Sequence, residues 1–214
     1  MSPLYAIVDV DMCAAARHLP EAVAAACLRA GVSHLQIRAK HLGSGAFLDL
    51  VRVVAPGALA AGAVLIVNDR VDVARSAGPG VGVHLGQGDL PVADARRLLG
   101  PDAVIGRSTH TPAELAAALS EPVTYVAYGP VFATRTKANP DPVVGLTGIR
   151  AAAAAARAAG RPLVAIGGIT LATAPTVTGA GATAVAVISD LLVPGEDPES
   201  RARRFLSVLM TNPV

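Results

Sequence analysis

The sequence predicts a single-domain α/β protein, a (β/α)₈ TIM barrel, and three observations lead to this fold class. Short runs rich in β-branched residues recur eight times along the 214 residues, and segments of helical composition lie between most of them. The runs are apolar on both faces, as the strands of a buried parallel sheet are. Eight strand and helix units in a chain of this length fit a closed barrel, with residues 1–214 as one domain. An open doubly wound sheet is the alternative.

Each element follows from its own residues. The strands are expected at 4–8, 34–38, 64–68, 81–85, 103–108, 124–129, 162–167 and 184–189. The helices are expected at 20–30, 46–61, 91–99, 112–119, 147–159 and 198–210. Several of these begin with Pro, Thr-Pro or Asp, residues typical of a first helical turn. The alanine-rich run 151–160 is expected to be a scaffold helix, because Ala is the best helix former and Gly160 stands at its end.

Composition excludes several classes of function. The net charge is +2, aromatic residues make up 3% of the chain and Trp is absent, so the sequence lacks the basic stripe and stacking surface of a nucleic-acid-binding protein. Asp9 and Asp11 interrupt the apolar N-terminal run, which predicts neither a signal peptide nor a membrane anchor and therefore a cytoplasmic protein. Cys13 and Cys27 lack metal-site spacing and are expected to be free thiols. The sequence leaves open whether the protein forms a homo-oligomer.

Polar residues follow the predicted strands at their carboxyl ends, which is where barrel enzymes place their active sites. Gln36, Arg38 and Lys40 alternate after the second strand, so their side chains share one face. The other strand ends contribute Asn68, Asp69, Gln87, Asp89, Ser108, Thr109, His110, Thr134, Arg135, Thr136, Lys137, Gly167, Gly168, Ile169, Thr170, Ile188 and Ser189. The sequence therefore predicts that these residues meet at one end of the barrel.

Charged residues in this set predict a site for a pyrophosphate and a metal ion. Arg38, Lys40 and Lys137 would repel one another unless a polyanion lay between them. Asp69 and Asp89 are a plausible Mg²⁺ pair, because this ion prefers one or two carboxylates together with water and phosphate oxygens. Lys40 and Lys137 are the only two lysines among 18 basic residues, which suggests that a compact ammonium group is wanted at both places.

A second anion site is predicted where strands seven and eight end. Gly168 and the Ile188-Ser189 pair would offer backbone N–H groups, in the usual place for a single phosphate in a barrel. Simpler readings exist for single residues. Asp69 could pair with Arg70 or cap a helix, the threonines at 134 and 136 could stabilise a turn, and the two glycines could only permit one. His84 is expected to be a core histidine, and His110 could be a cap, a surface residue or a catalyst. Because all of these residues lie at predicted strand ends on the same face of the barrel, a functional site is favoured over these simpler readings.

The motifs are similar to those of one known family. They are QIRAK at 36–40, NDR at 68–70, GVHLGQGDLP at 82–91, GRSTHT at 106–111, GPVFATRTK at 129–137, AIGGI at 165–169 and VIS at 187–189. Together and in this order they resemble thiamine-phosphate synthase. Members join a hydroxymethylpyrimidine pyrophosphate to a thiazole phosphate on a (β/α)₈ barrel with Mg²⁺, and release thiamine phosphate and pyrophosphate.

The resemblance implies a role for each matching residue. The pyrimidine pyrophosphate would be held by Gln36, Ile37, Arg38, Ala39, Lys40, Asn68, Ser108 and Lys137, and the thiazole phosphate by Thr134, Arg135, Thr136, Gly168, Ile188 and Ser189. Asp69 and Asp89 would bind Mg²⁺. Arg38, Lys40, Ser108 and Lys137 are expected to be the catalytic residues. Ala39 departs from the acidic residue that is common in the family, and the motif does not give His41 a role.

The implied chemistry is a dissociative substitution. Mg²⁺ and the cations would stabilise the charge on departing pyrophosphate, and the aminopyrimidine can bear the methylene cation that forms. No general base is then needed, and positioning of the thiazole nitrogen does the remaining work. Two alternatives stay open: a thiazole tautomerase of the same barrel group, and a non-catalytic protein that binds thiamine or phosphate and would not need the carboxylate pair.

Overall fold

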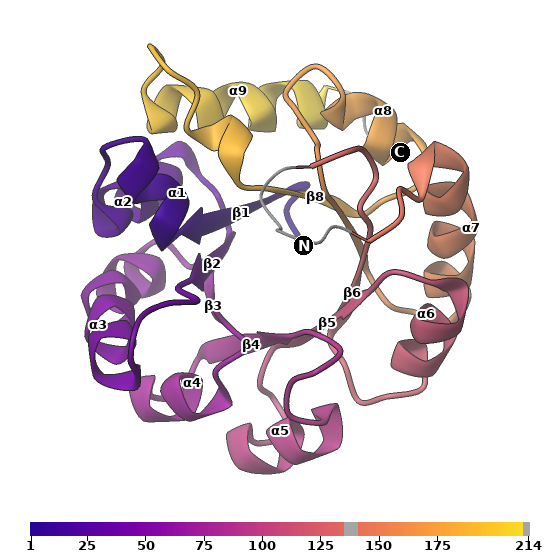
Figure 1. The fold of residues 1–214 in the computed structure, drawn as a ribbon, viewed down its shortest axis with the longest axis horizontal. Coiled ribbons are helices and arrows are strands. Elements are labelled where there is room, and N and C mark those ends of the chain that lie inside the picture. Colours follow the sequence, from indigo (N-terminus) through magenta and orange to yellow (C-terminus); the bar gives the residue numbers. More distant parts are fainter. Residues whose placement is uncertain (135–140, 212–214) are drawn as a thin grey trace.

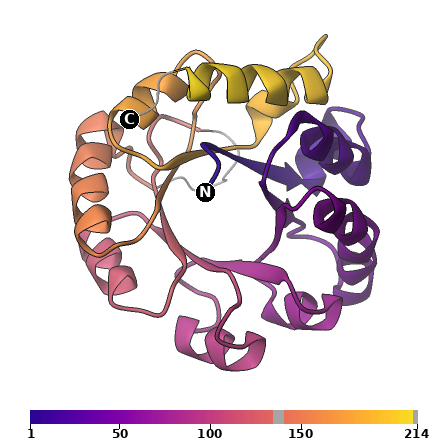
Figure 2. The same cartoon turned by 180° about the vertical axis from the view of Figure 1, so that it is seen from behind.

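The protein is a closed barrel of eight parallel strands. The computed structural model describes residues 1–134 and 141–211, and the strands are hydrogen-bonded to one another in sequence order, with β8 returning to β1. The barrel is seen down its axis in Figure 1 and from the opposite end in Figure 2, with the helices outside it in both views. The predicted fold class is confirmed, and the open doubly wound sheet is wrong.

The strands lie close to their predicted positions. They are β1 (Leu4–Asp9), β2 (His34–Arg38), β3 (Val64–Asn68), β4 (Val81–Leu85), β5 (Ile105–Thr109), β6 (Tyr125–Tyr128), β7 (Leu163–Ile166) and β8 (Ala184–Val187). The last three end before the predicted limits. β7 ends before Gly167, whose φ of 100° belongs to the left-handed region and cannot continue a strand. The residues that follow these short strands are therefore loop residues at the mouth of the barrel.

Helices follow the strands and cover the outside of the barrel. They are α1 (Val10–Ala15), α2 (Pro20–Ala30), α3 (Ser44–Ala60), α4 (Val71–Ala77), α5 (Val92–Leu99), α6 (Pro112–Leu119), α7 (Gly145–Ala158), α8 (Ala174–Gly179) and α9 (Pro198–Met210), with a 3₁₀ turn, η1, at Ser189–Leu191. The sequence did not predict α1, α4 and α8. Each has only six or seven residues, which is too short for a clear helical periodicity.

Alternation along the strands divides the core into two layers. On β1, the side chains of Leu4, Ala6 and Val8 pack between the sheet and the helices, whereas Tyr5 and Ile7 point inside the barrel. Burial on both faces is the reason that the strands read as nearly continuous apolar runs. The inner layer carries the polar groups that reach the site.

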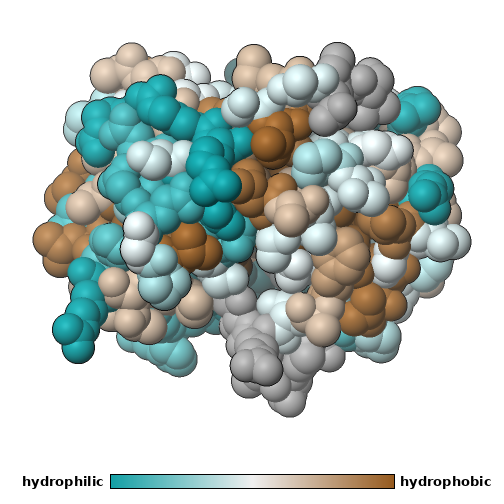
Figure 3. Space-filling view, turned by 90° about the horizontal axis from the view of Figure 1, so that it is seen from above, coloured by the Kyte–Doolittle hydropathy of each residue, from teal (hydrophilic) through white to brown (hydrophobic). Residues whose placement is uncertain are grey.

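Ion pairs hold the last helix, α9, to its surroundings. Arg201 on α9 bonds to Asp190 at 2.6 Å and to Glu196 at 2.9 Å, and Arg29 on α2 reaches Glu199 at 2.7 Å. The space-filling view from the α9 side shows hydrophilic side chains gathered over part of this face, with scattered apolar ones beside them (Figure 3). None of the helices in the described ranges is both long and apolar enough to cross a membrane.

Candidate active site

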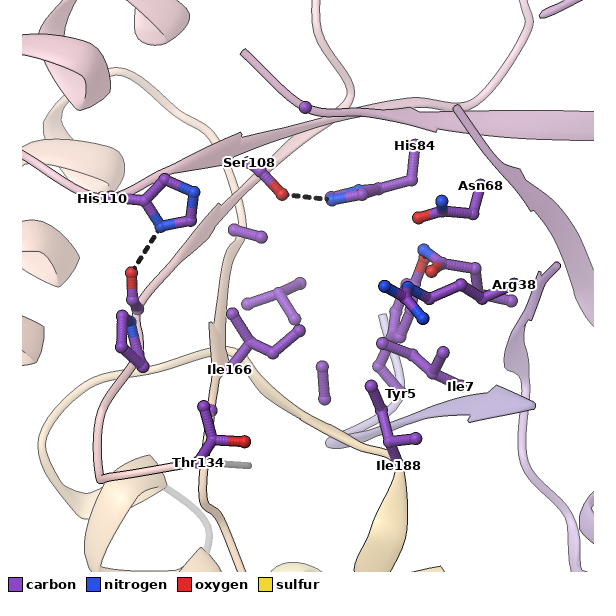
Figure 4. Close-up of a pocket in the computed structure, with 18 of the residues that line it drawn as sticks. Tyr5, Ile7, Arg38, Asn68, His84, Ser108, His110, Thr134, Ile166 and Ile188 are labelled. Atoms are coloured by element: carbon purple, nitrogen blue, oxygen red, sulfur yellow. Dashed lines mark hydrogen bonds between the residues drawn. The ribbon is translucent and has the colours of Figure 1, made fainter. Parts of the chain in front are cut away.

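A cavity of about 600 Å³ opens at the carboxyl ends of the strands. Eleven of the residues predicted to bind a substrate or Mg²⁺ line it: Gln36, Arg38, Lys40, Asn68, Asp69, Asp89, Ser108, Thr134, Gly168, Ile188 and Ser189. Figure 4 shows Ser108, His84 and Asn68 along one side, with Thr134 and Ile188 on the opposite side. Arg135, Thr136 and Lys137 lie outside the residues that the structure describes. The barrel thus brings together residues that are far apart in the sequence.

Two predicted substrate-binding residues have side chains outside the cavity. Ile37 and Ala39 are buried in the layer between the sheet and the helices, because they alternate with Gln36, Arg38 and Lys40. A motif that spans 36–40 without interruption does not separate the two faces of the strand. Only the backbone of these two residues is left for the predicted role.

Asp9 positions the guanidinium of Arg38, and the sequence analysis did not assign it this role. One carboxylate oxygen accepts a hydrogen bond from the Met12 N–H at 2.9 Å and caps α1, and the other accepts from Arg38 Nη1. The side chain of Asp9 is 2% exposed and that of Arg38 is 18% exposed. A buried carboxylate between a helix end and a cation fixes the direction in which Arg38 points into the cavity.

Lys40 and Asp69 form an ion pair at the mouth of the cavity, with Nζ and Oδ2 separated by 3.0 Å. Asp69 has a φ of 64°, in the left-handed region that residues other than glycine seldom adopt. Its backbone N–H donates to the carbonyl of His84 at 2.8 Å, which holds the turn after β3 against β4. The alternative that Asp69 pairs with Arg70 is wrong, because Arg70 bonds to Asp72 and to Ser44.

Asp69 and Asp89 lie close together, as the predicted metal pair requires. Burial raises the pKa of Asp89, and a hydrogen bond with Asp69 and the negative charge of Asp69 raise it further. Asp89 Oδ2 also accepts a hydrogen bond from the Gly86 N–H at 2.6 Å, which fixes its orientation. Two carboxylates at this short range favour a shared cation, and the ammonium of Lys40 is already beside Asp69.

This pair fits Mg²⁺ better than a metal that needs a complete protein shell. Within residues 1–134 and 141–211, no group of three or more His, Cys, Asp or Glu side chains is arranged to hold a metal. Mg²⁺ is commonly bound by one or two carboxylates, with water and phosphate oxygens completing its octahedron. The donor set therefore suits an ion that arrives with a phosphate-bearing ligand.

The two histidines of the cavity have different surroundings. His84 is buried, as predicted, but it also lines the cavity, and its Nε2 lies 2.8 Å from Ser108 Oγ. Burial lowers the pKa of His84 to about 4. His110 Nδ1 lies 2.7 Å from the Gly129 carbonyl, a bond drawn in Figure 4, and its backbone N–H donates to Glu114 at 2.7 Å. His41, which the motifs left without a role, lies on the surface 3.5 Å from Asp11.

The turn after β7 forms the opposite wall. Gly168 has a φ of 65°, and a Cβ atom there would lie 2.5 Å from the carbonyl oxygen of Ala133 and 2.9 Å from Phe132 Cβ. Glycine is thus required by the neighbouring loop, whatever ligand the turn binds. Asp190 supports this wall, since its carboxylate accepts from the Leu171 N–H at 2.7 Å and from Arg201 at 2.6 Å.

Comparison with known proteins finds a matching family model and relatives that cover most of the chain. The model of a family described as "Thiamine monophosphate synthase" matches residues 4–191. A thiamine-phosphate synthase from Anaeromyxobacter dehalogenans is 48% identical over 187 residues, 87% of this chain and 81% of that protein. One from Koribacter versatilis is 44% identical over 96% of this chain and 95% of its own. The structure of a thiamine phosphate pyrophosphorylase from Pyrococcus furiosus superimposes with a TM-score of 0.84 at 27% identity, covering 97% of this chain and 95% of that one.

Proposed function

The chain belongs to the thiamine monophosphate synthase family, and we propose that its cavity joins a pyrimidine pyrophosphate to a thiazole phosphate. The function is that of a thiamine-phosphate synthase, and the protein is a transferase. The observation that carries the assignment of the site is the meeting of Arg38, Lys40, Asp69 and Asp89 at the ends of β2, β3 and β4. Residues 1–214 act as one catalytic domain.

The pyrimidine pyrophosphate binds beside β2, β3 and β5. Arg38, held by Asp9, and Lys40 face the pyrophosphate, and Asn68 and Ser108 complete this side of the cavity. Asp69 and Asp89 would hold Mg²⁺, which would neutralise part of the charge on the pyrophosphate. Lys137, from the motif that follows β6, is assigned to the same group by the resemblance alone.

The thiazole phosphate binds at the opposite wall. Thr134, Gly168, Ile188 and Ser189 line that side of the cavity, and the last three belong to the β7 and β8 ends, where barrels usually bind a single phosphate. Arg135 and Thr136, outside the described residues, are proposed to join them. The pyrophosphate site and the thiazole-phosphate site lie on facing walls of the cavity. The thiazole ring therefore lies between the two sites, beside the pyrimidine ring.

The reaction breaks the bond between the pyrimidine methylene carbon and the pyrophosphate oxygen. The electron pair leaves with the pyrophosphate, where Arg38 and Lys40 stabilise the growing negative charge. The aminopyrimidine stabilises the methylene cation, and the thiazole nitrogen donates its electron pair to form the new C–N bond. The nitrogen that attacks carries no proton, so the site needs no general base. The apolar side chains in the cavity lining, such as Ile7, Ile166 and Ile188, help to exclude water from the cation.

The test mixes purified protein with both substrates and Mg²⁺ and detects thiamine phosphate by mass spectrometry. Product is expected with Mg²⁺, and its formation should stop in EDTA and return when Mg²⁺ is restored in excess. A tautomerase would convert the thiazole substrate without consuming the pyrimidine, and a binding protein would produce neither change. The location in the cytoplasm and the formation of a homo-oligomer stay predictions.

A further inference from the structure

A chain of hydrogen bonds crosses the interior of the barrel at the bottom of the cavity. Gln36 Nε2 donates to the Tyr5 hydroxyl at 2.9 Å, and the Tyr5 and Tyr125 hydroxyls are 2.7 Å apart. Tyr125 lies 2.9 Å from His84 Nδ1, and His84 Nε2 lies 2.8 Å from Ser108 Oγ. The chain thus joins two residues assigned to the pyrimidine substrate, Gln36 on β2 and Ser108 on β5.

The backbone of β5 is shaped to admit the middle of this chain. At Gly106, a Cβ atom would lie 2.3 Å from the Tyr125 hydroxyl and 2.6 Å from His84 Nδ1. Any larger residue would occupy the space in which these two groups meet. The rings of His84 and Tyr125 are also stacked, with centroids 5.6 Å apart. The packing at Gly106 and the ring stacking therefore both support the contact between Tyr125 and His84 inside the barrel.

Gln36 donates to Tyr5 at the start of the chain, and either partner can be the donor in each of the other three contacts. In the arrangement that runs one way from Gln36, the proton of Tyr5 is directed to Tyr125, and that of Tyr125 is directed to His84 Nδ1. Burial raises the pKa of both tyrosines, so both hydroxyls keep their protons. A neutral imidazole that accepts at Nδ1 carries its proton on Nε2. His84 then donates to Ser108, whose own O–H proton is left for another acceptor.

We propose that Tyr5, Tyr125 and His84 are positioning residues that hold the Ser108 hydroxyl as a hydrogen-bond donor toward the cavity. A pyrophosphate has only acceptor oxygens, so a hydroxyl that donated to His84 instead would turn its lone pairs toward the anion. The chain prevents that orientation before the substrate binds, and preorganised donors of this kind stabilise developing charge. The proposal rests on the proposed function, in which Ser108 contacts the pyrimidine pyrophosphate.

Nitrogen NMR tests the direction of the chain without any turnover. In the wild-type protein labelled with ¹⁵N-histidine, His84 is expected to be the Nε2–H tautomer, with Nδ1 unprotonated. Replacement of Tyr125 by Phe removes the donor to Nδ1 and should give a mixture of tautomers, whereas Tyr128→Phe should leave the His84 signals unchanged. Tyr128 is a matched control because it lies on the same strand with its ring in the outer layer. A wild-type His84 protonated at Nδ1 would overturn the proposal even if the protein makes thiamine phosphate.

Kinetics then test whether the chain acts through Ser108. Ser108→Ala should lower kcat on the order of a hundredfold, and Tyr125→Phe should lower it about five- to tenfold, the size of one neutral hydrogen bond. In the double variant, Tyr125→Phe should cost nothing further, because the hydroxyl that it orients is gone. If the two effects multiply instead, Tyr125 has a general structural role and the proposal is wrong. If Tyr125→Phe does not fold, Tyr5→Phe replaces it in the same measurements, because it breaks the hydrogen-bond chain one link earlier.

Discussion

Asp9→Asn tests whether a buried carboxylate holds the guanidinium of Arg38, which is proposed to face the pyrophosphate. The asparagine keeps an oxygen that can accept the Met12 N–H and cap α1, but it removes the negative charge opposite Arg38. A hydrogen bond to a charged group contributes about 1.5–3 kcal/mol. Because the side chain of Arg38 is 18% exposed and can regain some water, we expect a loss near the middle of that range, about 2 kcal/mol.

The same substitution should also lower turnover. An Arg38 without its buried partner has several orientations in place of one, and a small misplacement of a binding group can cost up to about a hundredfold in rate. We expect kcat/KM for the pyrimidine pyrophosphate to fall about ten- to a hundredfold. Urea unfolding gives the stability, and steady-state kinetics with the thiazole phosphate saturating gives kcat/KM.

Asp11→Asn is the matched control. Asp11 lies two residues further along, on α1, with its side chain 53% exposed and 3.5 Å from His41. A surface change of this kind should alter the free energy of unfolding by no more than about 0.5 kcal/mol and leave kcat/KM unchanged. Wild-type stability and kcat/KM in Asp9→Asn would refute the reasoning. A loss of stability with unchanged kcat/KM would show that Arg38 finds its position without Asp9.

Further outcomes are expected for the proposed metal ligands Asp69 and Asp89, for Gly168 in the turn after β7, and for Lys137, which lies outside the described residues. Asp69→Asn and Asp89→Asn should each lower the single-turnover rate at least about a hundredfold while circular dichroism stays native, and wild-type turnover in either variant would remove it from the metal site. Because the folded-state pKa of Asp89 is raised, this group stabilises metal-free protein at acidic pH and loses that contribution as pH rises through the raised pKa. Mg²⁺ should therefore raise Tm at pH 8 and have little effect at pH 4, and the reverse order in calorimetry would contradict the assignment. Gly168→Ala should raise KM for the thiazole phosphate more than for the pyrimidine substrate and lower Tm, since its Cβ would meet the Ala133 carbonyl; an unchanged KM would separate this turn from phosphate binding. Lys137→Ala should lower kcat about a hundredfold with a smaller effect on binding, and Lys137→Arg should restore only part of the rate, as rapid-quench experiments can show.

The strands and the charged groups could be predicted because their signals are local. Apolar runs locate the strands, and period-two alternation puts Arg38 and Lys40 on the face that lines the cavity. The short helices were missed, since six or seven residues give too few turns for a periodic pattern. Motif matching placed Ile37 and Ala39 in the site together with their neighbours, although alternation alone puts them on the other face.

The supporting residues could not be predicted, because their partners are distant in the sequence. Asp9 and Arg38 are 29 residues apart, and Tyr5 and Tyr125 are 120 residues apart. A single Asp at the end of the first strand or a single Tyr in an apolar run carries no local sign of such a partner. The predicted pairing of β1 with β2 in the barrel could have identified Asp9, because Asp9 and Arg38 are register partners on these two strands.

The charges at the ends of β1 to β4 support the proposal that a metal and a further cation belong in the site. At the ends of β1, β2, β3 and β4, the cations Arg38 and Lys40 stand with the carboxylates of Asp9, Asp69 and Asp89. Two cations against three carboxylates give no net attraction for a pyrophosphate. Mg²⁺ on Asp69 and Asp89 would reverse that balance, and Lys40 would then be released from its ion pair to face the leaving group. The ammonium of Lys137, which the resemblance assigns to the same substrate, would add one more positive charge to attract the pyrophosphate.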